Sequence, residues 1–370
     1  MIPMKIGFDA SSLRKNQSGV GHYTASLLSA LSTEFPDQRY LVLSHLPDCV
    51  PQGINLIRTQ KRAFPIKEIW MQAWVPRILA RYRPDLCHFT NSIAPLRMRV
   101  PYVVTVHDLS LIRHPEWHPW TRRIWMRRLI RPAVLGAREV LCDSEATRAD
   151  LRAWLNLPPD RLSVVPLGAR KVFTRVCPPE ERNAALQRHG LSRPYFLYLG
   201  NIEPRKNLLM LLRAFGQANL DQTELVLAGQ RAWLWEEIVR SLGTLKLESR
   251  VRLLDYVPDE DLPALMQSAR AFVYPSRMEG FGLPVLEAMV SGTAVVVSRI
   301  EPLTSLVADA GWIAEVDNVD QWRSALEEAC RDEEKRMVLA ARGRERALQY
   351  TWEATARMTM RCYERALSRS

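Results

Sequence analysis

Short apolar runs alternate with longer amphipathic stretches along the whole chain. The runs are rich in β-branched residues, and the stretches between them repeat apolar positions at helical spacing, which predicts βα units with parallel sheets. The first set of predicted strands is Lys5–Phe8, Tyr40–Ser44, Leu86–Phe89, Tyr102–Thr105, Glu139–Cys142 and Ser163–Val165, and the second is Tyr195–Leu199, Glu224–Ala228, Val251–Leu254, Ala271–Tyr274 and Ala294–Val297.

The two sets of strands predict two doubly wound α/β domains. The chain has 370 residues, enough for two domains that each bury a core. We place the first domain at residues 1–175 and the second at residues 176–352, with the segment Leu167–Pro194 as the interdomain connection. Two such domains facing a cleft would bind ligands at the carboxyl ends of their strands.

Composition narrows the class of protein. Hydrophobic residues make up 47% and charged residues 25%, as in ordinary globular domains. No apolar run is long enough to cross a membrane, and the N-terminus becomes charged too early for a signal peptide, so we expect a cytoplasmic protein. The six cysteines form no Cys-x-x-Cys pair, so we expect reduced, mostly buried thiols rather than a zinc site or disulfides.

The net charge of +11 favours an anionic partner: nucleic acid, acidic lipid or phosphorylated small molecules. Two basic stretches with tryptophans, residues 58–83 and 113–138, suit an anionic membrane surface. The second stretch suits equally a helix that packs its apolar face into the domain. No nucleic-acid module is present, so nucleic acid is the least favoured partner. On a helical projection of the second stretch, the apolar face holds Trp125, Met126, Leu129 and Ile130, and the other face holds Arg123, Arg127, Arg128 and Arg131.

The strongest chemical signal is the segment Pro275–Met289, which directly follows an apolar strand. Its glycines let backbone amides approach a ligand, and the proline after them suits the first turn of a helix, whose N-terminal amides attract phosphate. Glu279 lies on the predicted loop and Glu287 in the predicted helix. These carboxylates can hold hydroxyl groups on both sides of a diphosphate. For Glu287 alone, an acid that complements the helix dipole is a competitive alternative.

A second signal is the segment Leu197–Leu208, again a strand, a glycine and a predicted helix start. Arg205 and Lys206 arrive together at that helix N-terminus, where they can neutralise a leaving diphosphate. Cations at this position oppose the helix dipole, and a nearby anion would resolve the conflict. The alternative is a solvated basic pair.

These motifs resemble those of retaining, nucleotide-sugar-dependent glycosyltransferases of the GT-B fold, family four, also called group 1. The resemblance is densest over Tyr195–Ser298, where the Glu-x7-Glu segment is specific. The first half resembles the family more weakly, through the Gly-rich turn Ser18–Tyr23, the strand end Val106–Asp108 and the stretch Val164–Gly168. The resemblance implies two Rossmann-like domains facing a cleft, an acceptor-binding first domain, a donor-binding second domain, and a last helix, 353–370, that joins the first domain.

The resemblance also implies residue roles. Arg205 and Lys206 would grip the donor diphosphate, Glu279 the sugar hydroxyls and Glu287 the ribose, while His107 would lie beside the transferred sugar. The catalytic set is therefore Glu279, His107, Lys206 and Arg205; the donor site adds Gly200, Asn201, Gly280, Phe281, Gly282, Leu283 and Glu287; and Gly19, Val20 and Gly21 form the acceptor or phosphate loop.

Some of these positions have a second interpretation. Many relatives have an arginine where Asn201 stands, so part of the phosphate contact would come from Arg205 or a water. His107 follows an apolar strand and fits a structural histidine equally well without the resemblance. His22 is a weaker candidate, and the glycines before it also fit an ordinary turn. His114 and His118 are predicted as loop residues.

The triplet Asp259-Glu260-Asp261 has the Asp-x-Asp form of metal-dependent glycosyltransferases of another fold. It follows a proline and precedes an apolar stretch, so we interpret the acids as the cap and first turn of a helix. A basic pair on the diphosphate would make a metal unnecessary. We expect no catalytic metal and no cofactor besides the donor substrate.

We therefore predict a retaining hexosyltransferase that uses a nucleoside diphosphate sugar and a glycan or lipid-linked acceptor in cell-surface polysaccharide or lipopolysaccharide synthesis. The run Gly200–Asn207 is most similar to mannosyl- and deoxyhexosyl-transferases, which favours GDP-mannose or a GDP-deoxyhexose as donor, with a UDP-sugar second. The alternatives are a nucleotide-sugar epimerase or phosphorylase and a non-catalytic nucleotide-sugar or glycan-binding protein. The basic stretches would place the enzyme at the cytoplasmic face of the membrane.

Overall fold

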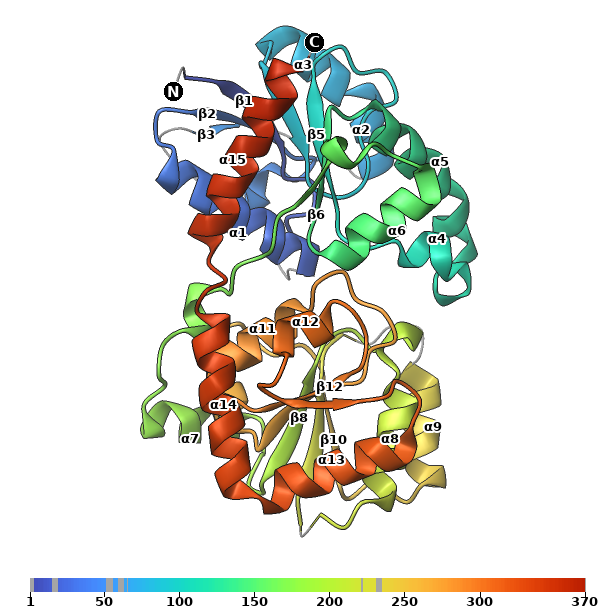
Figure 1. Ribbon diagram of the computed structural model, residues 1–370, viewed down its shortest axis with the longest axis vertical. Helices are drawn as coiled ribbons and strands as arrows, with labels where there is room; N and C mark the ends of the chain where they lie inside the picture. The colour runs from blue at the N-terminus through green and yellow to red at the C-terminus, as the bar shows by residue number, and fades with distance from the viewer. Residues whose placement is uncertain are drawn as a thin grey trace. The chain divides into compact units, whose positions relative to one another are not determined.

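The computed structural model describes residues 3–14, 19–50, 56–58, 63–64, 66–220, 222–230 and 235–369. The chain divides into two compact units (Figure 1). Unit 1 comprises Met1–Gly168 together with Thr351–Ser370, and unit 2 comprises Ala169–Tyr350. Each unit is a parallel sheet with helices, as the alternation of apolar runs and amphipathic stretches predicts.

Unit 1 contains, within the described residues, a seven-stranded sheet in the order β3-β2-β1-β4-β5-β6-β7, with every pair parallel. The strands are β1 (Lys5–Asp9), β2 (Arg39–Leu43), β3 (Leu56–Arg58), β4 (Leu86–Phe89), β5 (Tyr102–Val106), β6 (Glu139–Cys142) and β7 (Leu162–Val164). The helices are α1 (Gly19–Glu34), α2 (Lys67–Ala73), α3 (Val75–Tyr82), α4 (Ser110–Arg113), α5 (Trp120–Gly136), α6 (Glu145–Leu155) and α15 (Trp352–Ser368), with 3₁₀ turns η1 (Pro47–Cys49), η2 (Pro115–Trp117) and η3 (Pro159–Arg161).

Unit 2 contains, within its described residues, a six-stranded parallel sheet in the order β10-β9-β8-β11-β12-β13. The strands are β8 (Tyr195–Leu199), β9 (Glu224–Ala228), β10 (Val251–Leu254), β11 (Ala271–Tyr274), β12 (Val295–Ser298) and β13 (Trp312–Ala314). The helices are α7 (Pro179–Arg188), α8 (Leu208–Gln217), α9 (Trp235–Thr244), α10 (Leu262–Ser268), α11 (Leu283–Val290), α12 (Leu303–Val307), α13 (Val319–Arg331) and α14 (Glu333–Ala347), with 3₁₀ turns η4 (Lys171–Phe173) and η5 (Pro204–Lys206).

The connection between the units is shorter than the sequence suggests. Unit 2 begins at Ala169 rather than at residue 176, because the residues that follow pack against unit 2. Arg170 binds Glu287, and the carbonyl of Phe173 accepts a hydrogen bond from Ser291. Helix α7 packs against α10, so most of the predicted connection is folded structure.

The last helix, α15, belongs to unit 1 and lies against α1 (Figure 1). The buried carboxylate of Glu139 pairs with Arg365 of α15. Tyr363, also on α15, contacts His88 of β4 with 2.7 Å between the hydroxyl oxygen and Nδ1. These contacts attach the C-terminal helix to the sheet of unit 1.

The apolar face of the basic helix α5 packs into unit 1. Leu129 and Ile130 are buried in the core, and Met126 packs partly buried against it. The side chain of Trp125 lies outside the described residues. For this helix the structure therefore supports the packing interpretation. Among the described helices, none is long and apolar enough to span a bilayer.

All six cysteines are free thiols. Cys49 is partly exposed, and the other five are buried. The prediction that the cysteines are mostly buried is confirmed.

Candidate active site

In each sheet the strand order reverses once, between β1 and β4 in unit 1 and between β8 and β11 in unit 2. Doubly wound sheets bind ligands outside the carboxyl ends of the strands at such a point. The two strongest sequence motifs directly follow β8 and β11, which are paired neighbours. The sheet therefore brings together two loops that lie more than seventy positions apart in the sequence.

Two cations and two carboxylates meet where these loops join. Lys206 Nζ lies 2.6 Å from Glu279 Oε1, and Arg205 Nη1 lies 3.2 Å from the same oxygen. Arg205 Nε lies 2.5 Å from Glu203 Oε1, and Lys206 Nζ donates to the hydroxyl of Tyr274 at 2.5 Å. The side chains of Lys206 and Glu279 are only 5% and 8% exposed. Arg205 is the most exposed of the four, at 20%, and the formal charges of the four side chains sum to zero.

Burial and charge shift the pKa values in opposite directions in this cluster. Burial raises the pKa of Glu279, but Lys206 and Arg205 outweigh it, so that the pKa lies below its ordinary value. Burial lowers the pKa of Lys206 and the nearby Arg205 lowers it further, with a partial offset from Glu279. Glu279 is therefore an ionised acceptor at neutral pH.

Arg205 and Lys206 do not lie in the first turn of a helix. They form the 3₁₀ turn η5, and α8 begins only at Leu208, after Asn207 adopts a left-handed conformation with φ 56°. The predicted conflict with the helix dipole is relieved in this way, and Glu203 and Glu279 provide the anions. Glu203 was missed at the sequence level, although its place two residues before Arg205 was a usable signal.

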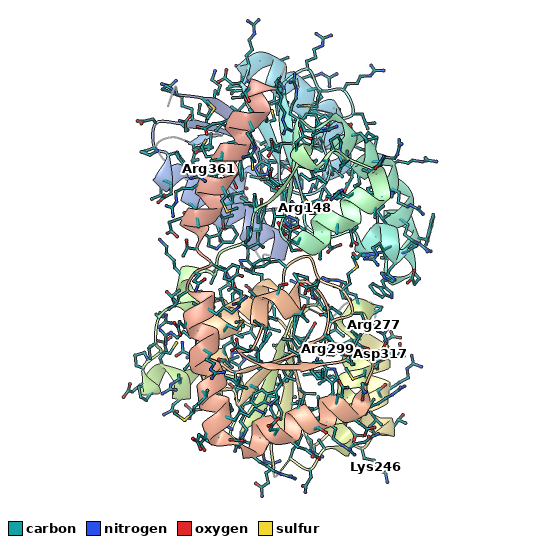
Figure 2. The ribbon with its side chains drawn as sticks, viewed as in Figure 1. Arg148, Lys246, Arg277, Arg299, Asp317 and Arg361 are labelled. Atoms are coloured by element: carbon teal, nitrogen blue, oxygen red, sulfur yellow. The ribbon has the colours of Figure 1, made fainter. Side chains whose placement is uncertain are left out.

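A third loop stabilises the first two. The side-chain amide of Asn207 donates to the Val316 carbonyl at 2.8 Å and to Asp317 at 3.1 Å. Arg277 donates to the same Asp317 oxygen at 2.9 Å, and the two side chains lie together in Figure 2. The backbone amide of Arg277 also donates to the Arg205 carbonyl at 2.8 Å. Main-chain and side-chain bonds thus fix the loops that carry the charge cluster.

The segment after Glu279 adopts the predicted loop-to-helix structure. Gly282 has φ 102°, and a Cβ there would lie 2.5 Å from Leu303 Cδ2, so both backbone and space require glycine. Helix α11 begins at Leu283 with Pro284 in its first turn, and Glu287 lies in its middle. Phe281 packs against Tyr350 with 5.9 Å between the ring centres. Gly280 lies between Glu279 and this ring, at the start of the phosphate-binding turn we expect.

Glu287 is buried and bound to an arginine that sequence reasoning did not single out. Arg170 Nε lies 2.5 Å from Glu287 Oε1, and Arg170 Nη2 lies 3.2 Å from Oε2. Burial raises the pKa of Glu287, and Arg170 offsets only part of that effect.

The structure also explains why a glycine follows β8. Gly200 has φ 152°, and a Cβ there would lie 2.9 Å from the Tyr198 hydroxyl oxygen. That hydroxyl donates to the Asn201 carbonyl at 3.0 Å. Asn201 itself is exposed, so this position carries a neutral side chain at the surface.

The interpretation of Asp259-Glu260-Asp261 as helix-capping acids is wrong in one respect. Asp261 stands at the N-cap position of α10, but its carboxylate makes no capping bond. It pairs with Arg188 and with His189, the latter at 2.9 Å, while Asp259 pairs with Arg170 at 3.0 Å. Asp259 and Asp261 therefore form ion pairs with other segments. Within the described part of the chain, no cluster of three His, Cys, Asp or Glu side chains could hold a metal.

In unit 1, both ring nitrogens of His107 are engaged. Nδ1 lies 2.7 Å from Asp143 Oδ2, and Nε2 lies 2.9 Å from the Thr90 carbonyl oxygen. A carbonyl oxygen only accepts, so Nε2 carries a hydrogen. Burial lowers the pKa of His107, but the charge of Asp143 and the bonds to Asp143 and Thr90 raise it above its ordinary value. The raised pKa of His107 favours the protonated ring, and burial raises the pKa of Asp143 as well. Asp143 was not foreseen from the sequence.

The glycines near the N-terminus belong to a helix. Helix α1 begins at Gly19, so Gly19, Val20 and Gly21 form its first turn rather than a separate loop, and Ser18 lies outside the described residues. Thr24 of α1 donates to the Thr90 hydroxyl at 3.2 Å, which fixes this turn beside the carboxyl end of β4.

The remaining candidate histidines have other surroundings. His22 lies in α1. His114 stacks on Trp117 with 3.9 Å between ring centres, and His118 Nε2 lies 3.1 Å from the Ser110 hydroxyl.

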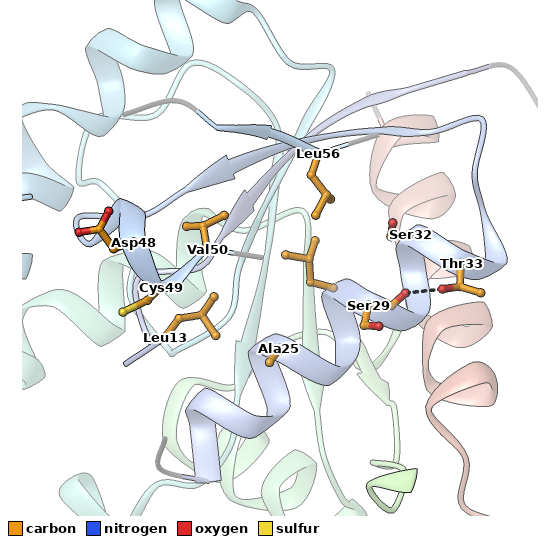
Figure 3. A pocket seen from close by; sticks show the side chains of 10 residues that line it. Leu13, Ala25, Ser29, Ser32, Thr33, Asp48, Cys49, Val50 and Leu56 are labelled. Carbon is orange, nitrogen blue, oxygen red and sulfur yellow. Dashed lines mark hydrogen bonds between the residues drawn. The ribbon is translucent and has the colours of Figure 1, made fainter. Parts of the chain in front are cut away.

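A cavity of about 550 Å³ lies in unit 1, between α1 on one side and residues 48–50 and Leu56 on the other (Figure 3). Ala25 and Ser29 of α1 line one side, and Asp48 and Cys49 line the other. None of the predicted site residues lines it. It is therefore separate from the motifs described above.

Models of known protein families match both halves of the chain. The family Glycosyl transferases group 1 matches residues 180–346, and Glycosyltransferase Family 4 matches residues 18–170. An O-antigen chain mannosyltransferase B from Escherichia coli is 32% identical over 388 aligned positions, covering 98% of this chain and 100% of that protein.

Two solved structures share the fold over nearly the whole chain. A sucrose-phosphate synthase from Thermosynechococcus elongatus has a TM-score of 0.78 at 19% identity and covers 99% of this chain and 100% of its own. HepE from Anabaena in complex with UDP-glucose has a TM-score of 0.75 at 20% identity and covers 98% of each chain.

The chain belongs to glycosyltransferase family 4, the group 1 glycosyl transferases. It is a glycosyltransferase with two Rossmann-like domains of the GT-B type. The predicted family, the fold class and the assignment as a hexosyltransferase are confirmed, and retention at the anomeric carbon stays a prediction.

Proposed function

We propose that this enzyme transfers a hexose, with retention at the anomeric carbon, from a nucleoside diphosphate sugar to a glycan or lipid-linked acceptor in cell-surface polysaccharide synthesis. The observation that carries the proposal is the buried cluster of Arg205, Lys206 and Glu279 at the strand-order reversal of unit 2. Its cations suit a diphosphate, and its carboxylate suits sugar hydroxyls. Glu287 lies on the other side of the turn Gly280–Gly282, which we call the glycine turn, and it suits a ribose.

The charge cluster offers donors to a diphosphate without a metal. The ammonium group of Lys206 has three N–H bonds, of which two donate to Glu279 and Tyr274. The third has no acceptor among the residues that the structure describes. Arg205 and the first amides of α11 add further positive potential. These groups would stabilise the charge that develops as the bond to the diphosphate breaks.

We infer front-face attack for the transfer step. The acceptor hydroxyl attacks the anomeric carbon on the side of the leaving diphosphate, and a departing phosphate oxygen takes the acceptor proton. Glu279 orients the sugar through its hydroxyls. His107, held between Asp143 and Thr90, supplies a fixed positive charge rather than a base.

For the donor we propose GDP-mannose or a GDP-deoxyhexose first and a UDP-sugar second. A full-length relative is named as an O-antigen mannosyltransferase, which supports mannose. A more distant neighbour of the same fold binds UDP-glucose, which supports the second choice.

We further propose that the enzyme works at the cytoplasmic face of a membrane. The support is an exposed apolar group around α2, formed by Ile66, Ile69 and Trp74. Leu96 is also exposed and lies beside α2, because its backbone amide donates to Gln72 at 2.9 Å. Exposed basic residues adjoin this group in the sequence, and they suit anionic lipid headgroups. They are Arg77, Arg81, Arg97 and Arg99.

Vesicle binding tests the membrane proposal. The variant Trp74→Ser with Ile69→Ser should lose binding to vesicles that contain anionic lipid. The control Met337→Ser removes an exposed apolar side chain from α14 and should bind as the wild type does. Equal binding of the two variants would contradict the proposal.

The transfer reaction is tested with GDP-mannose, GDP-fucose, UDP-glucose and UDP-galactose, each with a lipid-linked or free oligosaccharide acceptor. We expect one donor to give a product whose new linkage has the anomeric configuration of the donor, by proton NMR. Release of free sugar phosphate without acceptor would indicate phosphorolysis. Tight donor binding with neither transfer nor slow hydrolysis would indicate a non-catalytic protein.

A further inference from the structure

Arg170 occupies a distinctive position at the entry to unit 2. Its guanidinium makes two bonds to the Glu287 carboxylate, at 2.5 Å and 3.2 Å, and one to Asp259, at 3.0 Å. It also lies over the ring of Phe173, 4.8 Å from the ring centre. The Arg170 side chain is 12% exposed and that of Glu287 only 3%. This is a buried, two-pronged arginine–carboxylate pair.

We propose that Arg170 is a positioning residue for nucleoside binding: it holds the Glu287 carboxylate so that both oxygens can accept hydrogen bonds from the ribose hydroxyls of the donor. The proposal rests on the proposed function, which assigns the ribose to Glu287. It adds a residue that acts on the nucleoside only through Glu287.

The count of hydrogen bonds supports this role. An ionised carboxylate has about four acceptor sites, two on each oxygen. Among the described residues, Arg170 is the side chain that donates to Glu287, and it uses one site on each oxygen. One further site on each oxygen remains, which matches the two adjacent hydroxyls of a ribose. The pair therefore has the stoichiometry of a diol-binding site.

The ionisation of Glu287 depends on the same contact. A carboxyl group buried in α11 has its pKa raised by loss of water, and Arg170 is the cation that opposes this effect. A protonated carboxyl would replace one acceptor site by a donor and would match the two hydroxyls less well. Arg170 thus supports both the orientation and the charge of the acceptor.

The backbone of Arg170 is held in place by the chain that crosses back to unit 1. The amide of the preceding residue, Ala169, donates to the Tyr350 carbonyl at 3.1 Å. The ring of Tyr350 packs against Phe281 of the glycine turn. Tyr350 therefore contacts both the residue before Arg170 and the glycine turn. The arginine side chain reaches Glu287 from a backbone position that is held in place.

The test compares a nucleoside diphosphate with its 2′,3′-dideoxy analogue. Calorimetry measures the dissociation constants of GDP and dideoxy-GDP, with the UDP pair in parallel, for the wild type, Arg170→Met and Arg175→Met. Arg175 is the matched control because it lies five positions along the same segment and pairs with Glu181 at the surface, 2.7 Å away. The thermal midpoint of each variant verifies folding.

For the wild type, we expect removal of the two hydroxyls to weaken binding at least tenfold, roughly the loss of a hydrogen bond to a charged group. Arg170→Met should bind the ribonucleotide about tenfold more weakly and should then discriminate little between the two ligands. Arg175→Met should behave as the wild type does. Arg170→Lys keeps the charge but not the two-pronged geometry, so it should also lose most of the discrimination while remaining folded.

The inference is overturned if either Arg170 variant keeps the wild-type ratio between the two ligands. It is also overturned if the wild type binds both ligands equally, which would remove the ribose from Glu287 while leaving the diphosphate site standing. Failure of the wild type to bind any nucleoside diphosphate would overturn the proposed function itself, and this inference with it.

Discussion

Lys206 and Glu279 form a buried ion pair, with 2.6 Å between Nζ and Oε1. The cation that we assign to the donor diphosphate is therefore neutralised by the carboxylate that we assign to the donor sugar. Lone buried charges are costly, and in this pair each charge compensates the other. Binding of a donor would give Lys206 a second anionic partner through its third N–H bond.

The pairing predicts opposite effects of Glu279 variants on binding and turnover. Glu279→Gln keeps the size of the side chain but removes the charge. We expect transfer to fall by roughly 10²-fold or more, because sugar positioning is lost in the transition state. Binding of the free nucleoside diphosphate should be kept or become tighter, because Lys206 and Arg205 lose an anionic competitor. Steady-state kinetics and calorimetry measure the two effects; normal turnover would contradict the role of Glu279.

The lowered pKa of Lys206 predicts an alkaline limit for diphosphate binding. As the pH rises through a pKa that lies below the ordinary 10.5, the ammonium loses its charge and nucleoside diphosphate affinity should fall. Arginine does not titrate in this range, so Lys206→Arg should bind more weakly at neutral pH but show no such fall. Calorimetry from about pH 7 to pH 10 gives both profiles. An alkaline fall that persists in Lys206→Arg would assign the titration to another group.

The His107–Asp143 contact predicts that stability depends on pH. The folded pKa of His107 is raised, so its contribution to the free energy of unfolding is full below the unfolded pKa and is lost as the pH rises through the folded pKa. Asp143→Asn removes the charge that raises this pKa. We expect the fall in stability as the pH rises above about 6.5 to be smaller in this variant, as measured by chemical unfolding.

Nitrogen NMR gives an independent view of the same histidine. At neutral pH both ring nitrogens of His107 should have the shifts of N–H groups, because Thr90 and Asp143 both accept. A neutral ring with an unprotonated Nδ1 would show that His107 is available as a base.

The glycine turn predicts a difference between two glycine-to-alanine variants. Gly282→Ala meets both a left-handed backbone and a Cβ only 2.5 Å from Leu303, so we expect a loss of roughly 2–4 kcal/mol in the free energy of unfolding. Gly190 also has a positive φ, of 66°, but nothing lies within 4 Å of its Cβ, so Gly190→Ala should lose only about 1 kcal/mol. Chemical unfolding measures both, and equal losses would contradict the packing argument.

Buried parallel strands were predictable because their apolar runs are continuous and bounded by polar residues. Strands β4, β6, β8, β9, β10 and β11 have the predicted bounds. Strands β3 and β13, which lie at sheet edges and have three residues each, were missed, whereas the equally short edge strand β7 was predicted one residue late.

The site was predictable where its residues lie close together in the sequence. Glu279 and Glu287 share one loop and helix, and Arg205 and Lys206 share one turn. Arg170 lies 117 positions from Glu287, and Asp143 lies 36 positions from His107. Only folding brings these partners together, so no local sequence pattern predicts them.

The measurement that tests the central claim most directly is the thermal midpoint of the wild-type enzyme with GDP, UDP, ADP and dTDP, each without and with magnesium. A ligand that binds only the folded state must raise the midpoint. We predict a rise with one nucleotide, GDP first, that does not require magnesium and is lost in Lys206→Met. The absence of a rise with every nucleotide, or a rise that Lys206→Met retains, would contradict a diphosphate site at Arg205, Lys206 and Glu279.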